Sequence, residues 1–116
     1  MISDTDFIAA ADRTLDALGA ALDDALERSD IDLDWSLNDG ILEIESENGN
    51  RIVVNRHVPN REIWVATRSG GFHFRPAGGV WRDTRSDKEL AAALAGIIRD
   101  DTTLEINLPP LPAPEL

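Results

Sequence analysis

Residues 47–74 read ENGNRIVVNRHVPNREIWVATRSGGFHF, and this stretch decides the fold. It contains three short runs that are rich in β-branched and aromatic residues, as strands are. Asn48-Gly49, Pro59-Asn60 and Ser69-Gly70-Gly71 border these runs, and such residues favour tight turns. Because strands joined by tight turns pair with their neighbours in sequence, the stretch predicts the centre of an antiparallel meander.

Further strands are expected on both sides of this centre. Upstream, residues 31–37 alternate apolar and polar side chains, and Asn38-Asp39-Gly40 leads into a second run, ILEIE. Downstream, Gly78-Gly79 precedes the run VWRDT. The sheet should therefore have about six strands.

Helical periodicity appears at both ends of the chain. A helix over about 3–27 is predicted by apolar residues at spacings of four and three, namely Phe7, Ala11, Leu15, Leu18, Leu22 and Leu26. A second helix is predicted over about 87–99, because Ser86 and Glu89 form a capping-box pattern ahead of Leu90, Leu94, Ile97 and Ile98.

This order of elements predicts an α+β fold, a two-layer sandwich with both helices on one face of the antiparallel sheet. The other face should be open to solvent or a partner. We expect one domain over residues 1–108 and a proline-rich C-terminal tail over 109–116, which contains four prolines and could pack on the helices through its leucines. Residues 103–108 could add a short strand.

Composition excludes several functions. The absence of cysteine excludes disulfides and thiolate ligation of a cluster, and a net charge of −11 opposes nucleic acid and anionic membranes. No stretch is long and apolar enough to span a bilayer, and the N-terminus lacks signal-peptide features, so a cytoplasmic location is expected. Residues 1–49 carry a net charge of −12, so the negative charge of the protein is concentrated in the first half of the chain.

The carboxylates of that half form the strongest candidate site. We call this series the acidic ridge: Asp12, Asp16, Asp23, Asp24, Glu27, Asp30, Asp32 and Asp34. Oxygen ligands suit hard or borderline cations such as Fe²⁺, Mg²⁺ or Mn²⁺. Like charges four residues apart also destabilise a helix, so Asn at positions 23 and 24 is expected to raise the melting temperature. A merely solvated face is the alternative.

On the predicted sheet, strand parity separates two faces. Ile63 and Val65 should face the core, which places Trp64 on the open face beside Asn55 as a candidate partner anchor. His57 and His73 lie on separate strands without metal-ligand or nucleophile–base spacing, so structural or surface roles are expected for them.

Taken together, the 47–74 stretch, the acidic first helix, the SDIDLDW entry to the first strand and the closing helix resemble the frataxin family, in its bacterial CyaY branch. The resemblance covers about residues 3–108. It implies a cytoplasmic, non-enzymatic protein that binds Fe²⁺ or Fe³⁺ weakly and modulates a cysteine desulfurase and its iron–sulfur cluster scaffold.

In that family the ridge serves both iron and the desulfurase, which implies Asp23 and Asp24 as partner contacts beside Asn55 and Trp64. Gly19 and Ala20 depart from the acids that relatives often carry there. The resemblance also implies a monomer in the absence of iron. A nucleic-acid mimic, an acidic module that binds basic proteins without metal, is the alternative, and a two-carboxylate hydrolase is a weaker third class because exposed acids lack an enclosed pocket.

Overall fold

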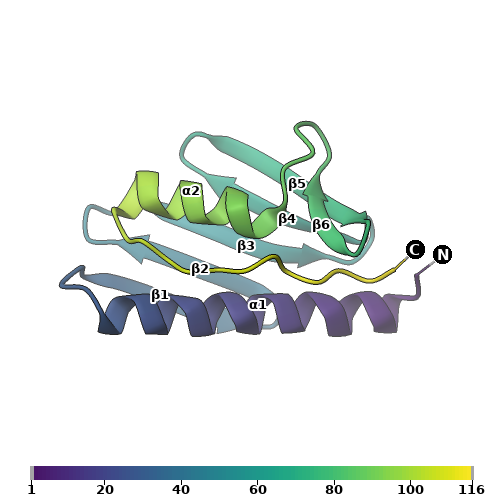
Figure 1. Cartoon of the computed structure of the whole chain (residues 1–116), viewed down its shortest axis with the longest axis horizontal. Coiled ribbons are helices and arrows are strands. Elements are labelled where there is room, and N and C mark those ends of the chain that lie inside the picture. Colours follow the sequence, from purple (N-terminus) through teal and green to yellow (C-terminus); the bar gives the residue numbers. More distant parts are fainter. Residues whose placement is uncertain (1, 116) are drawn as a thin grey trace.

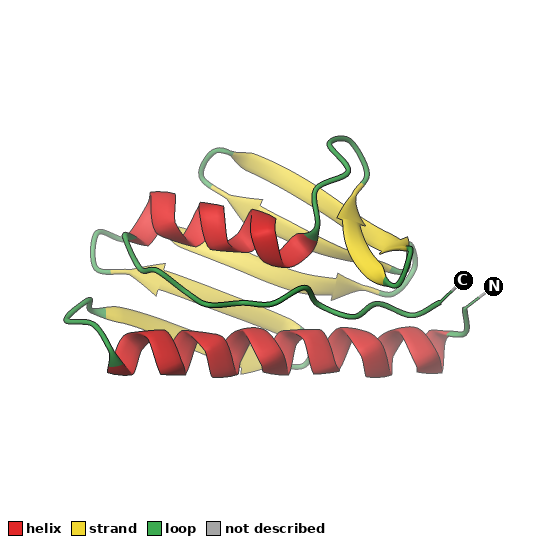
Figure 2. Ribbon diagram, viewed as in Figure 1, coloured by secondary structure: helices red, strands yellow, loops and turns green. Residues whose placement is uncertain are grey.

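The computed structural model describes residues 2–115. Its elements follow in the order α1 (Asp4–Glu27), β1 (Leu33–Asn38), β2 (Ile41–Ser46), β3 (Arg51–His57), β4 (Glu62–Thr67), β5 (Gly70–Ala77), β6 (Val80–Asp83) and α2 (Leu90–Thr102). Both helices lie on the same side of the sheet, and the last residues of the chain run between them (Figure 1 and Figure 2). The predicted two-layer α+β sandwich is confirmed.

The sheet is a meander of six antiparallel strands in the order of the sequence. Asp39 and Gly40 join β1 to β2 with φ values of 49° and 78°, the two positive angles of the hairpin turn that matches strand twist. The first strand begins at Leu33, so the expectation that Ile31 belongs to it is wrong. Ile31 instead packs, partly buried, against the core.

Apolar residues of α1 and one face of the sheet form the core. Phe7, Leu15, Leu18 and Leu22 are at most 1% exposed, as the helical spacing predicts. Trp81 of β6 lies edge-on to Phe7, with ring centroids 5.9 Å apart, and its indole N–H donates to the Thr14 hydroxyl over 3.0 Å. This bond satisfies the polar end of a fully buried tryptophan.

The start of α2 differs from the prediction. Glu89, not Ser86, is the N-cap, and its carboxylate accepts the N–H groups of Ala91 and Ala92. Asp87 has a φ of 64°, which is incompatible with a helix, so the helix cannot begin at 87. At its other end α2 extends to Thr102, where Thr103 adopts the left-handed cap conformation.

After α2, residues 103–115 form an extended C-terminal segment that runs between the two helices (Figure 1). Leu104 and Leu111 are 1% and 2% exposed. The Leu111 N–H donates to Glu89 over 3.2 Å, and the Ala113 N–H donates to the Gly79 carbonyl over 2.9 Å. The segment pairs with β6 only at the isolated Val80–Pro112 bridge, and residues 103–108 form no strand, so the expected additional strand is wrong.

Asp83 closes the turn between β6 and α2. Burial raises the pKa of its carboxyl, but hydrogen bonds from the N–H groups of Arg85 and Ser86 and the charge of Arg85 outweigh burial and lower it. Because the folded pKa lies below the unfolded one, the ionised group stabilises the fold above about pH 4, and this contribution is lost as the pH falls through the folded value.

We therefore expect Asp83→Asn to unfold at a lower urea concentration than the wild type at pH 7, with the difference shrinking below about pH 4. Urea unfolding followed by circular dichroism at a series of pH values measures this. The exposed Glu105→Gln is the control for removal of one negative charge. A difference that is independent of pH would contradict the assignment.

Candidate metal and partner surfaces

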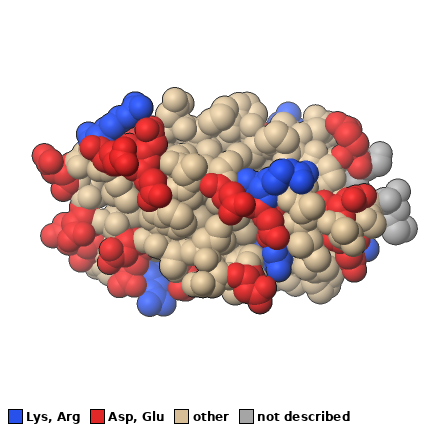
Figure 3. All heavy atoms as spheres, turned by 90° about the horizontal axis from the view of Figure 1, so that it is seen from below, with Lys and Arg blue, Asp and Glu red and all other residues tan. Residues whose placement is uncertain are grey.

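The acidic ridge lies along α1 and the adjoining edge of the sheet. A view onto this edge shows acidic side chains gathered most densely at the end where α1 gives way to β1 (Figure 3). Asp12 is partly exposed, and the other seven ridge residues are exposed. The helix therefore presents its own ridge carboxylates to solvent, as their spacing predicts, and the remaining three follow in the connection to β1 and in β1 itself.

Three ridge carboxylates already have partners. Asp12 pairs with Arg56, whose side chain is only 19% exposed and also lies 3.4 Å from Asp39. Asp23 accepts the Trp35 indole N–H over 2.9 Å. Asp24 pairs with Arg28 over 3.2 Å, with both side chains exposed. Each partner competes with a cation, so these three acids are the weaker ligands of the ridge.

Five ridge residues have no hydrogen-bond or ion-pair partner among residues 2–115, namely Asp16, Glu27, Asp30, Asp32 and Asp34. Asp30 and Asp32 also line a hollow of about 540 Å³ together with Glu47 and Asp101. One oxygen of Asp101 is buried and has no hydrogen-bond partner within the part of the chain that the structure describes. Glu47 lies in the turn between β2 and β3, and Asp101 lies in α2. These two acids are far from the ridge in sequence, and only the tertiary fold brings them beside it.

No three Asp, Glu or His side chains of the described chain converge in an arrangement that could hold a metal ion. A cation at the ridge would therefore have few protein ligands at once and keep much of its water, which predicts weak binding.

Trp35 accounts for the glycine in the middle of the ridge. A Cβ at Gly19 would lie 2.6 Å from the Trp35 ring, so any side chain there would clash with the indole. The indole is held in this position by Asp23. The departure at Gly19 is therefore a packing requirement of this chain.

These contacts change which acids should be neutralised to stabilise the protein. Asp23 and Asp24 have partners, whereas Asp16 and Glu27 each face a like charge four residues away, and Glu27 also lies at the negative end of the α1 dipole. We expect Asp16→Asn with Glu27→Gln to raise the melting temperature by about 1–3 °C at low salt.

Differential scanning fluorimetry measures that gain, which should shrink in ~0.5 M NaCl because salt screens exposed charges. Asp23→Ala is the matched comparison and should lower the melting temperature, since it leaves the Trp35 N–H without its acceptor. A double variant that melts at or below the wild type would show that repulsion along the ridge is negligible.

The opposite surface is the open sheet face, formed by the strand side chains that point away from the helices. Ile63 and Val65 are buried, as strand parity predicts, and Trp64 is half-buried on the open side, directly opposite Asn55. Ile41, which is 44% exposed, pairs with Asn55 on the other flank. Ile41 is a candidate contact that sequence reasoning missed, because its neighbours depend on the strand register.

His57 and His73 flank Trp64 on this face. Their rings are stacked on the indole with centroids 3.6 Å and 4.3 Å away. The sequence placed the two histidines on different strands but gave no sign that a third strand would bring them together around one tryptophan.

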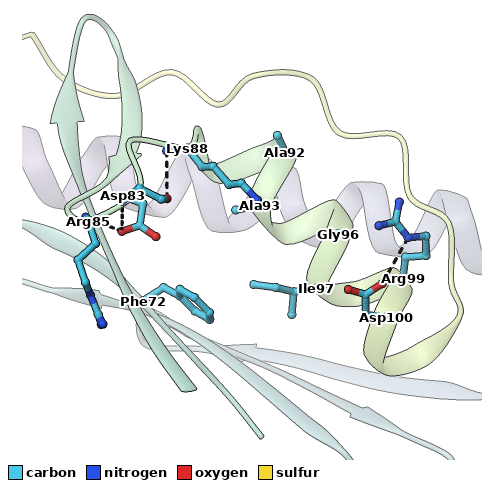
Figure 4. A pocket seen from close by; sticks show the side chains of 11 residues that line it. Phe72, Asp83, Arg85, Lys88, Ala92, Ala93, Gly96, Ile97, Arg99 and Asp100 are labelled. Carbon is cyan, nitrogen blue, oxygen red and sulfur yellow. Dashed lines mark hydrogen bonds and ion pairs between the residues drawn. The ribbon is translucent and has the colours of Figure 1, made fainter. Parts of the chain in front are cut away.

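A further concave feature lies between α2 and β5, with a volume of about 420 Å³. Phe72 and Ile97 face each other across it, and Lys88 extends along it (Figure 4). Arg99 pairs with Asp100 at its rim, and Asp83 is bonded to backbone N–H groups. Asp83, Arg99 and Asp100 of this groove therefore already have partners. Neither helix is long and apolar enough to cross a lipid bilayer within residues 2–115.

Comparison with known proteins gives a consistent result. A family model described as a frataxin-like domain matches residues 1–103. The iron–sulfur cluster assembly protein CyaY of Cupriavidus taiwanensis is 43% identical over 91% of this chain and 96% of its own length. The protein of the same name from Burkholderia mallei is 43% identical over 82% of this chain and 87% of its own length.

Solved structures agree with the sequence matches. Frataxin from Psychromonas ingrahamii superposes with a TM-score of 0.76 at 29% identity, covering 91% of this chain and 97% of that one. Trimeric frataxin from Saccharomyces cerevisiae, complexed with ferrous iron, superposes with a TM-score of 0.70 at 28% identity, covering 81% of this chain and 86% of that one. The fold, the matched family model and these relatives show that the chain belongs to the frataxin-like family, in which its relatives are CyaY proteins.

Proposed function

We propose that this protein is a non-catalytic, iron-binding regulator of iron–sulfur cluster assembly that acts in the cytoplasm. In this proposal the acidic ridge binds Fe²⁺ or Fe³⁺ weakly, and the protein modulates a complex of a cysteine desulfurase and a cluster scaffold. The names of the curated relatives and the ferrous iron of the yeast structure support the process and the metal. The protein is proposed to be a monomer without iron.

The observation that carries the proposal is the set of partner-free carboxylates at the end of the ridge where α1 gives way to β1. Glu27, Asp30 and Asp32 lie there, all exposed, and two of them line the hollow that also contains Asp101. Uncompensated carboxylates attract cations and basic protein surfaces, and one surface could serve both. Asp23 and Asp24 remain proposed desulfurase contacts beside this end.

Apart from Asp34, which pairs with Glu45 at the β1 edge of the open sheet face, the ridge and the open sheet face give the protein two separate surfaces. A regulator of a two-protein complex needs to reach more than one component, and Trp64 with Asn55 provides a second contact away from the acids. The alternative, a nucleic-acid mimic that needs only its anionic surface, gives no role to a half-exposed tryptophan.

A binding comparison separates the two candidates. We expect the protein to bind a desulfurase–scaffold complex more tightly than it binds a basic DNA-binding protein of similar charge, and Trp64→Ala to weaken only the first interaction. Biolayer interferometry at two salt concentrations measures both. Equal binding to both targets, unaffected by Trp64→Ala, would favour the mimic and contradict the assembly role.

The metal part of the proposal predicts a pattern of paramagnetic broadening. Mn²⁺ or Fe²⁺ should broaden backbone NMR signals most strongly near Glu27, Asp30 and Asp32. Broadening should be weaker near Asp12, whose carboxylate is already paired with Arg56, and absent near Asn55. The physical reason is that partner-free oxygens bind hard cations without breaking an existing contact.

Titration of the ¹⁵N-labelled protein with Mn²⁺ measures this, and Glu27→Gln with Asp30→Asn should reduce the broadening. Zn²⁺, which is diamagnetic, is the control for structural effects. Broadening centred on His57 or His73 would contradict the assignment of the metal site to the ridge.

A further inference from the structure

The indole of Trp64 is enclosed between two imidazoles on the open sheet face. His57 of β3 covers one face of the indole and His73 of β5 covers the other, with interplanar angles of 7° and 5°. Both faces of the tryptophan are therefore occupied within the protein. A partner that contacts Trp64 must meet the edge of the indole and the edges of the two imidazoles beside it.

Glu62 fixes the rotation of the indole within this stack. Its Oε1 accepts the Trp64 Nε1–H over 2.8 Å and lies 3.7 Å from His73 Nδ1. The Glu62 side chain is only 15% exposed. A carboxylate with so little water contact interacts strongly with a positive charge beside it, and a proton on His73 would supply that charge.

The two imidazoles are not equivalent. His57 Nδ1 is buried without a hydrogen-bond partner among the described residues, so a proton there would be an unsatisfied donor. The His73 side chain is 43% exposed, and its Nδ1 faces Glu62. Protonated His73 would gain this carboxylate and also a cation–π contact with the indole.

Few other charges face the stack. On β5, Arg75 lies two residues from His73. Arg82 of β6 lies opposite Arg75 in the strand register. On the other flank, Asn55 and Ile41 are uncharged, and the first charged neighbour is Glu43 of β2, opposite Val53. Both helices and the C-terminal segment lie on the opposite side of the sheet (Figure 1). Among residues 2–115, Glu62 is therefore the only carboxylate with a contact to the stack.

We infer that His57, Glu62 and His73 form an indole clamp that positions Trp64 edge-on for its partner, and that protonation of His73 tightens this clamp. The inference rests on the proposed role of Trp64 as a partner anchor. The clamp residues are positioning residues, because they hold the Trp64 side chain in place. A side chain that is already held in its bound orientation loses less conformational entropy when the partner binds.

The first arm of the test needs no partner. The three indole N–H signals are followed by ¹H–¹⁵N NMR at a series of pH values between about 8 and 5.5. We expect the Trp64 signal, identified by its loss in Trp64→Phe, to move with His73. Trp81, bonded to the Thr14 hydroxyl, and Trp35, bonded to Asp23, are internal controls and should stay in place. A Trp64 signal as static as that of Trp81 overturns the proton-sensitive clamp.

The second arm compares His73→Phe with the wild type in binding to the desulfurase–scaffold complex. Phenylalanine retains a stacked ring but cannot take up a proton, so the two proteins should bind equally near pH 8. Near pH 6 the wild type should bind about two- to fivefold more tightly. Protonation of groups on the partner complex affects the binding of both proteins equally, so its effect cancels in the ratio of the two affinities. A ratio that is constant with pH overturns the role of the proton.

Positioning itself is tested by His73→Ala and Glu62→Gln at pH 8. We expect His73→Ala to weaken binding about three- to tenfold through loss of the stack, with Glu43→Gln on the same face as the unaffected control. Glu62→Gln keeps an acceptor for the indole and should bind normally at pH 8 while losing the pH dependence. If Trp64→Ala weakens binding but His73→Ala does not, the clamp is refuted and the partner surface stands. If Trp64→Ala has no effect, the partner surface itself is refuted.

Discussion

Removal of residues 104–116 is expected to lower the free energy of unfolding by about 4 kcal/mol or more. Leu104 and Leu111 are almost fully buried between the helices, and loss of each buried leucine typically costs about 2–5 kcal/mol. The truncation also removes the bond from Leu111 to Glu89 at the start of α2. A loss of this size is a large part of the total stability of a small domain, which is about 5–15 kcal/mol.

Urea unfolding of a chain that ends at Thr103 measures this effect. Leu111→Ala alone should account for roughly half of it, about 2–3 kcal/mol. The control is Glu105→Ala, an exposed position in the same segment that should unfold as the wild type does. A truncated chain with an unchanged unfolding midpoint would show that residues 104–116 contribute nothing to the stability of the domain.

The second large effect is expected on binding. Trp64→Ala should weaken the proposed complex with the desulfurase and scaffold by about 2 kcal/mol or more, close to thirtyfold, because a partly buried aromatic side chain within the proposed interface would act as an anchor. Metal binding at the ridge should be unchanged, since α1 and the open sheet face lie on opposite sides of the strands.

Thermal unfolding must be measured on the same variant. Trp64 lies outside the buried core, so its removal should cost little more than the energy of its two stacked pairs, about 1–3 kcal/mol. Trp81→Ala is the comparison, because Trp81 is fully buried and should cost about 3–5 kcal/mol. If Trp64→Ala destabilises the protein as much as Trp81→Ala does and binds normally when folded, then Trp64 is a structural residue.

Local signals in the sequence were sufficient for most of the fold. Asp39-Gly40 and the alternation of Ile63, Trp64 and Val65 determine turns and faces within a few residues, so the meander and its two faces could be predicted. The start of α2 could not, because Ser86 and Glu89 match a capping box, and only the left-handed backbone of Asp87 excludes it. Such a conformation follows from the turn that Asp83 organises.

The candidate sites were predictable in outline but not in detail. Helical spacing places the ridge acids on one surface, yet the pairing of Asp12 with Arg56 spans 44 residues, and the bond from Trp35 to Asp23 joins a strand to a helix. The stack of His57, Trp64 and His73 depends on the register of three strands. Contacts between distant segments have no signature in a single sequence, so these partners emerged only from the structure.

The proposed modulation of a cysteine desulfurase through two surfaces can be tested by the rate of sulfide production by the desulfurase. This rate is measured with and without the protein, at fixed scaffold and Fe²⁺ concentrations. We expect the rate to change when the wild type is added, to change less with the variant that carries Glu27→Gln and Asp30→Asn, and to change less with Trp64→Ala. A rate that is the same with and without the protein, at every Fe²⁺ concentration, would refute this modulation.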